Sequence, residues 1–145
     1  MTLLIILHTL AATVWVGGHL ILSIIILPDA WKKNDYKIIS IFENSFERIG
    51  IPSLIIQVVT GIWMSHLYLP VSKWFDFSNA ISSLISIKLI LLVLTIGLAI
   101  HARFVIIPKL DNSKIPLLAS HIIAVTIIGI IFLIVGLSFR LNFLF

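Results

Sequence analysis

The sequence predicts an all-α integral membrane protein, an antiparallel up-down-up-down bundle of four transmembrane helices with the N and C termini outside. Of the 145 residues, 60% are hydrophobic and only 11% are charged, and the mean hydropathy is +1.19. Four apolar runs are each long enough to cross ~30 Å of hydrocarbon, which takes about 20 residues. Short connections between successive helices favour antiparallel neighbours. We therefore expect one domain, residues 1–145.

The order of the elements follows from the apolar runs and from the prolines between them. The four membrane helices are expected at about residues 3–27, 49–69, 80–105 and 116–139. Pro28 and Pro70 are expected to end the first two helices, because a proline disfavours helix in the residue before it. Residues 35–48 form an amphipathic cytoplasmic segment with apolar side chains three and four residues apart. This segment either lies in the membrane interface or extends the second helix.

Basic residues set the expected orientation. The first connection carries Lys32, Lys33, Lys37 and Arg48, the third carries Arg103, Lys109 and Lys114, and the second carries only Lys73. Cytoplasmic loops of membrane proteins are enriched in Lys and Arg, so the first and third connections should face the cytoplasm. The net charge of +4 is spread along the chain and forms no basic run, so no nucleic-acid partner is expected. The absence of cysteine excludes thiolate metal sites.

The histidines are the candidate functional residues. His8 and His19 lie eleven residues apart, which places them within ~20° of one helical face and ~16 Å apart along the axis. An imidazole inside a membrane span is costly and marks a functional-site candidate. The expected topology sorts the polar side chains into two layers. The outer layer contains His8, His66 and Lys88, and the inner layer contains His19, His101 and His121.

Neutral imidazole is a ligand for haem iron, copper and zinc. Two imidazoles from different helices would hold haem b, and two layers would hold two haems. Alternatively, His19, His101 and His121 would hold copper or zinc in the inner layer. The interpretation without a cofactor is that histidines near helix ends form hydrogen bonds at the membrane interface and that Lys88 extends its ammonium towards water. These interpretations stay open at this point.

Several stretches of the chain resemble a known family. The segment from His8 to His19, with Trp15 and the Gly17-Gly18 pair, is similar to the opening helix of short CopD (copper-resistance D) membrane proteins. Later motifs extend the resemblance over nearly the whole chain: Phe42-Glu43, Phe46-Glu47, Gly50-Ile51-Pro52, Gln57 to Gly61, Lys88, His101-Ala102-Arg103, Ile107-Pro108 and His121. The resemblance implies a multi-pass protein of the bacterial inner membrane and a link to copper. A more distant resemblance to HemJ-type haem-binding membrane proteins matches His8 and Lys88.

From these observations we expect a b-type haem-binding inner-membrane protein that transfers electrons through bis-histidine haem. A copper-binding, copper-transport or copper-resistance protein is the first alternative, and an accessory subunit of a membrane complex is the second. Membrane oxidoreductase activity is left open. The lipid bilayer is the expected partner, with a redox partner or quinone and a homodimer as further alternatives.

Overall fold

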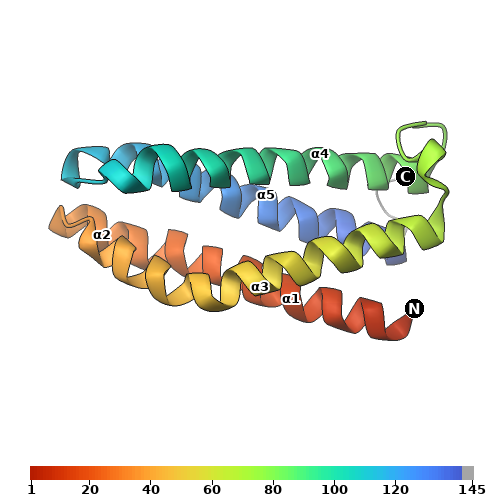
Figure 1. The fold of residues 1–145 in the computed structure, drawn as a ribbon, viewed down its shortest axis with the longest axis horizontal. Coiled ribbons are helices and arrows are strands. Elements are labelled where there is room, and N and C mark those ends of the chain that lie inside the picture. Colours follow the sequence, from red (N-terminus) through yellow and green to blue (C-terminus); the bar gives the residue numbers. More distant parts are fainter. Residues whose placement is uncertain (142–145) are drawn as a thin grey trace.

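The computed structural model describes residues 1–141 and contains, within them, four long helical rods (Figure 1). The first rod consists of α1 (Thr2–Ile21), a π-helical turn (Leu22–Ile26) and α2 (Leu27–Lys33), and the second is α3 (Lys37–Tyr68). The third consists of α4 (Ala80–His101), a π-helical turn (Ala102–Ile106) and a 3₁₀ turn (Ile107–Lys109). The fourth consists of a 3₁₀ turn (Asn112–Lys114) and α5 (Ile115–Leu141). Each rod is long and apolar enough to span a membrane. The predicted all-α bundle of four membrane helices is confirmed.

The first and third rods continue beyond the points at which the sequence predicts that they end. Pro28 lies inside the first rod, two residues after its π-helical turn, and Pro108 has the same position after the π-helical turn of the third rod. A proline in a regular α-helix clashes with the carbonyl four residues earlier. In the turn before Pro28 the backbone bonds are wider than in a regular α-helix, since Leu27 N–H bonds to the carbonyl of Leu22, five residues back. The first rod therefore continues past its proline, whereas the third ends one residue beyond Pro108.

The amphipathic segment 35–48 belongs mostly to α3. That helix runs without interruption from Lys37 to Tyr68, so of the two alternatives the structure adopts the extension of the second helix. A helix of this length is about 48 Å long, well beyond ~30 Å of hydrocarbon. One end of α3 therefore extends past the apolar layer.

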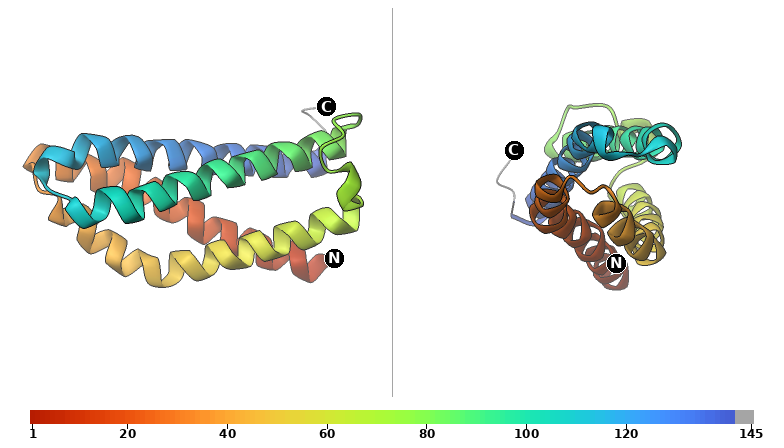
Figure 2. Two further views of the ribbon diagram at one scale, coloured as in Figure 1. Left: turned by 45° about the horizontal axis from the view of Figure 1, so that its top comes forward. Right: turned by 90° about the vertical axis from the view of Figure 1, so that its left-hand side faces the viewer.

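The four rods do not all pack on one another. α1 packs against α3 on one side and against α5 on the other, and α5 packs in turn against α4, whereas α3 and α4 hardly touch. The end-on view shows α4 set apart from α3 (Figure 2). The connection formed by residues 69–79 is long enough to separate them. Its fold is held by Ser82, whose hydroxyl donates to the carbonyl of Lys73 at 2.6 Å, and by the Asn79 cap on the amide of Ser82 at 2.9 Å.

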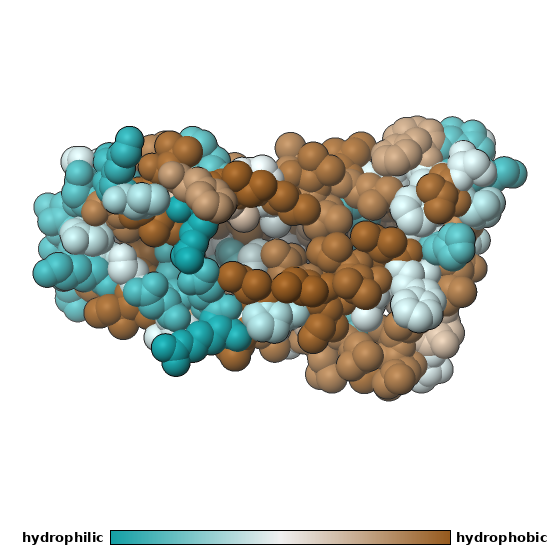
Figure 3. All heavy atoms as spheres, in the orientation of Figure 1, coloured by the Kyte–Doolittle hydropathy of each residue, from teal (hydrophilic) through white to brown (hydrophobic). Residues whose placement is uncertain are grey.

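The two ends of the bundle differ in charge. Met1, Leu141 and residues 69–79 lie at one end, here called the termini end (Figure 1). The connections 34–36 and 110–114 lie at the other end, here called the basic end, which carries most of the lysine and arginine residues. The space-filling view shows polar side chains gathered at the basic end and an apolar band next to it (Figure 3). Exposed apolar side chains on this scale are typical of a lipid-facing surface.

The tightest packing between helices involves a phenylalanine ring that lies between two glycines. Phe46 of α3 fills the space beside Gly18 of α1, so a Cβ atom at Gly18 would lie 2.1 Å from Phe46 Cζ. On the other side, a Cβ atom at Gly50 would lie 2.7 Å from Phe46 Cε1. Phe42 stacks on the same ring with centroids 5.7 Å apart. This contact fixes the register of α1 against α3 and hence the position of both histidines of α1.

Candidate functional site

His8 lies on the face of α1 that packs against α3. Its Nδ1 is 2.9 Å from the hydroxyl of Thr60, and a Cβ atom at Gly61 would lie 3.1 Å from its Cε1. The Thr60 hydroxyl donates its proton to the carbonyl of Ile56 at 2.6 Å. Its oxygen is then left to accept, so His8 Nδ1 is the donor. In a neutral ring this leaves the lone pair on Nε2.

Lys88 belongs to the same layer as His8, as the sequence predicts. Its ammonium is 5.2 Å from the centroid of the Phe139 ring and next to Gly136, where a Cβ atom would lie 3.4 Å from Nζ. The three ion pairs found within residues 1–141 do not include Lys88. The cation of this membrane span is thus held against an aromatic ring and lies, like His8, in the half of the bundle nearer the termini end.

His66 has a different environment. Its side chain is exposed on α3, and it follows Gly61 by five residues, which places it ~140° around the helix from the position that faces His8. The structure therefore pairs His8 with Thr60 and leaves His66 on another face of α3. The sequence predicts how deep His66 lies in the membrane, whereas the rotation of α3 about its own axis decides which way the side chain points.

His19 also faces α3, so the shared face of the two histidines of α1 is present in the structure. Its Nδ1–H donates to the carbonyl of Trp15 at 3.0 Å, and its ring lies 4.3 Å from the Trp15 ring between centroids. The edge of its ring meets Phe46 at 5.9 Å. On the opposite side of the helix, Thr126 of α5 donates to the carbonyl of His19 at 3.2 Å. His19 is therefore enclosed by aromatic rings at the junction of α1, α3 and α5.

His101 and His121 form a direct pair. His101 Nδ1 is 2.8 Å from His121 Nε2, and the two rings are nearly parallel, at 21°, with centroids 4.9 Å apart. His121 Nδ1 is 3.1 Å from the carbonyl of Leu117, which can only accept. A neutral His121 therefore carries its proton on Nδ1 and accepts on Nε2 from His101. α4 and α5 thus bring two imidazoles together near the basic end.

The structure assembles two of the three predicted inner-layer histidines. Thr126 lies at the level of His19, and His121 precedes it by five residues, so His19 lies about 7.5 Å deeper along α5 than His121. Within residues 1–141, no cluster of three or more His, Cys, Asp or Glu side chains is arranged to hold a metal ion. The pair on α4 and α5 and the single His19 are therefore separate features.

Three of the five histidines share one arrangement. His8, His19 and His121 each donate from Nδ1 to an oxygen acceptor, which leaves Nε2 as the basic nitrogen. Histidines that bind metals are commonly oriented in this way by a carbonyl or carboxylate on the second ring nitrogen. The same bond also satisfies a buried imidazole in a helix that binds nothing. The arrangement shows which nitrogens are available to a ligand.

Two polar features lie outside the predicted site. The side-chain oxygen of Gln57, three residues before Thr60, is buried without a hydrogen-bond partner in the described part of the chain. Near the basic end, Glu47 of α3 and Arg103 of the third rod form a two-pronged ion pair, with N–O distances of 3.0 and 3.1 Å. This pair connects two rods that otherwise hardly touch. The bonding of both features depends on the contacts between helices.

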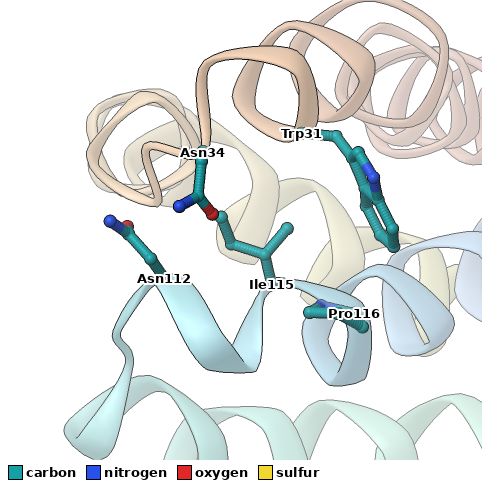
Figure 4. Close-up of a pocket in the computed structure, with 5 residues that line it drawn as sticks. All are labelled: Trp31, Asn34, Asn112, Ile115 and Pro116. Atoms are coloured by element: carbon teal, nitrogen blue, oxygen red, sulfur yellow. The ribbon is translucent and has the colours of Figure 1, made fainter.

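A pocket of about 170 Å³ opens at the basic end and contains none of the predicted site residues. It is lined by Trp31, Asn34, Asn112, Ile115 and Pro116 (Figure 4). Asn112 also accepts a hydrogen bond from the backbone amide of Tyr36 at 3.1 Å. These contacts hold together the two connections of the basic end, so the pocket is a structural junction.

The comparison with known families concerns the part of the chain that holds α3, α4 and α5. Residues 41–139 match the family model described as copper resistance protein D (CopD). The chain belongs to the CopD family. No curated protein and no solved structure shows significant similarity to it. The resemblance to the CopD family is thus confirmed, and this chain is a multi-pass membrane protein. The matched region includes His66, Lys88, His101 and His121, while His8 and His19 precede it.

Proposed function

We propose that this CopD-family chain binds copper and that His101 and His121 are ligands. The observation that carries the proposal is the 2.8 Å separation of His101 Nδ1 and His121 Nε2. Two nitrogens bound to one ion at ~2.0 Å and at ~90° to each other, as in a tetragonal Cu²⁺ site, would be separated by about 2.8 Å. The family is associated with copper resistance, and this supports copper over zinc.

The hydrogen bonds of the pair support the same proposal. The bond from His121 Nδ1–H to Leu117 fixes the ring and leaves Nε2 basic. For His101 to bind through Nδ1, its proton would shift to Nε2, which changes the tautomer and leaves the net charge unchanged. Imidazole nitrogen suits Cu²⁺, whereas Cu⁺ favours sulfur. The chain has no cysteine and only two methionines, so we propose Cu²⁺ as the bound species.

Copper loading of single variants tests this proposal. The full-length protein in detergent is incubated with Cu²⁺, freed of excess metal and measured for copper per chain. His101→Ala and His121→Ala should each lose most of the bound copper, because each removes half of the nitrogen pair. His66→Ala is the matched control, since His66 is exposed on α3 and outside the pair. If both variants keep the copper content of the parent, His101 and His121 are not ligands and the proposal fails.

Haem b is the second candidate, and a specific observation favours it. His8 and His19 both present Nε2 as the free nitrogen on one face of α1, and histidine is an axial ligand of haem iron. α3 and α4 hardly touch, and between them the space-filling view shows a groove with atoms paler than the apolar rows on either side (Figure 3). We propose this groove as the region that would accept a flat ligand.

The visible spectrum of the dithionite-reduced protein tests the second candidate. A sharp α-band that is lost in His8→Ala or His19→Ala would support haem binding by α1. His66→Ala again serves as the control. A colourless protein that holds copper through His101 and His121 would rule out haem and retain the first proposal.

A further inference from the structure

The histidine pair lies at a depth where lipid tails, rather than water, would surround it. The third rod runs from Ala80 to Lys109 and contains 30 residues, which corresponds to ~45 Å with its centre near residue 94. His101 is then about 10 Å from the centre, inside the ~15 Å half-thickness of the hydrocarbon layer. Its side chain is exposed on the outer surface of α4. Through the exposed His101, the copper pair of the proposed function would therefore be open to the bilayer.

An imidazole in this position has unmet bonding capacity. The bond to His121 uses His101 Nδ1, and no described side chain is bonded to His101 Nε2. A polar group that faces lipid without partners is costly, and such groups usually face a protein neighbour or a cavity. The pair is also incomplete as a metal site, because it has two nitrogens where Cu²⁺ takes about four. The described residues provide no third ligand of the His, Cys, Asp or Glu type nearby.

The surface beside the pair has room for a close neighbour. Gly97 lies one helical turn before His101 on the same exposed face of α4, and a Cβ atom there would meet nothing within 4 Å. Phe104, on the next turn, is 74% exposed. Small residues on a membrane helix let two backbones approach closely. Gly97 alone would not define an interface, but it lies next to the incomplete metal pair.

We propose that a second copy of this chain completes the copper site, so that one ion is bound by His101 and His121 from each of two copies. The proposal rests on the copper function proposed above. A two-fold axis beside His101 would bring the same surface of both copies together, as in most homodimers. Four imidazole nitrogens would then surround the ion, and both α4 helices would cross at Gly97. The two missing nitrogen ligands would then be supplied, and the lipid exposure of the pair would be removed.

The ratio of copper to protein tests this inference. The full-length protein in detergent is saturated with Cu²⁺ and then measured for copper per chain, for molar mass by light scattering, and for nitrogen coupling by electron paramagnetic resonance. We expect one copper per two chains, the mass of a dimer, and coupling to four nitrogens. Addition of EDTA should shift the mass towards the monomer. His101→Ala should abolish both copper binding and the shift in mass.

A pair of glycine variants separates the dimer from the metal site. Gly97→Leu should weaken the copper-dependent dimer at least tenfold, because the larger side chain keeps the two α4 helices apart. Gly17→Leu is the matched control, since Gly17 of α1 also has open space for a Cβ atom. Because the chain has no cysteine, Gly97→Cys provides a second measurement. A short bismaleimide should cross-link two copies at residue 97 and should not cross-link Gly17→Cys.

The outcomes distinguish this inference from the proposed function. One copper per chain on a monomer, lost in His101→Ala, would overturn the dimeric site and leave copper binding by the pair intact. Copper that does not depend on either histidine would overturn the proposed function and the dimeric site together. A copper-dependent dimer that Gly97→Leu does not weaken, and that residue 97 does not cross-link, would overturn the proposed interface.

Discussion

Substitution of Gly18 by alanine tests the packing that positions the histidines of α1. The new Cβ atom would lie 2.1 Å from Phe46 Cζ and 2.2 Å from Phe46 Cε2, where ordinary contacts lie at 3.4–4 Å. The ring would have to move by more than 1 Å, and it is confined by the Gly50 backbone, by Phe42 and by His19. Over-packing of this kind typically costs about 1–3 kcal/mol. We therefore expect Gly18→Ala to be less stable than the parent protein.

The neighbouring glycine provides the reference for this measurement. Gly17→Ala introduces the same methyl group into open space, and both variants gain about 1 kcal/mol of helix propensity from the loss of glycine. The free energies of unfolding of the two variants should therefore differ by about 1–3 kcal/mol. Unfolding by SDS in mixed micelles, followed by far-UV circular dichroism, measures this difference. In a Phe46→Leu background, where the ring is absent, the difference should shrink. Equal stability of Gly17→Ala and Gly18→Ala would refute the reasoning.

Three further predictions concern orientation, haem and the ion pair. Reporter fusions after Lys33 should report the cytoplasm and fusions after Lys73 the periplasm, because basic connections remain inside; the reverse result would invert the proposed orientation. If haem is bound, His8→Ala should abolish or convert the low-spin signal of one haem, as measured by the reduced visible spectrum, and an unchanged spectrum would remove His8 as a ligand. Glu47→Gln should lower the free energy of unfolding by less than about 1 kcal/mol, because the Glu47–Arg103 pair is partly exposed and screened. A loss of several kcal/mol in the same SDS titration would contradict this expectation.

The helices could be predicted because each depends on a property of a single segment. The length of an apolar run decides whether it spans the bilayer, and the helical period decides that His8 and His19 share a face. The antiparallel order of the last two membrane helices places His101 and His121 at the same depth, and the structure brings them together at 2.8 Å. These features need no knowledge of how one helix is rotated against another.

The rest of the site depends on rotation and register between helices, which no single segment determines. Thr60 is the partner of His8 because the Phe46 ring fits beside Gly18 and sets how far α3 slides along α1. His66 has the predicted depth, but its side chain lies on another face of α3. The continuation of the first rod through Pro28 could not be predicted either, because the π-helical turn before this proline is a property of the folded chain.

The separation of α3 and α4 has a consequence for how molecules exchange with the bundle. Between these two rods, the Glu47–Arg103 pair forms one fixed point, and the ring contact of Tyr68 with Phe139 of α5, at 5.6 Å, ties the far end of α3. The stretch from Glu47 to Tyr68 corresponds to ~32 Å of helix, close to the thickness of the hydrocarbon layer. A groove between α3 and α4 over this length would open sideways onto the acyl chains of the lipid. Apolar molecules would enter through it by lateral diffusion within the leaflet, at the concentration set by their partition into lipid.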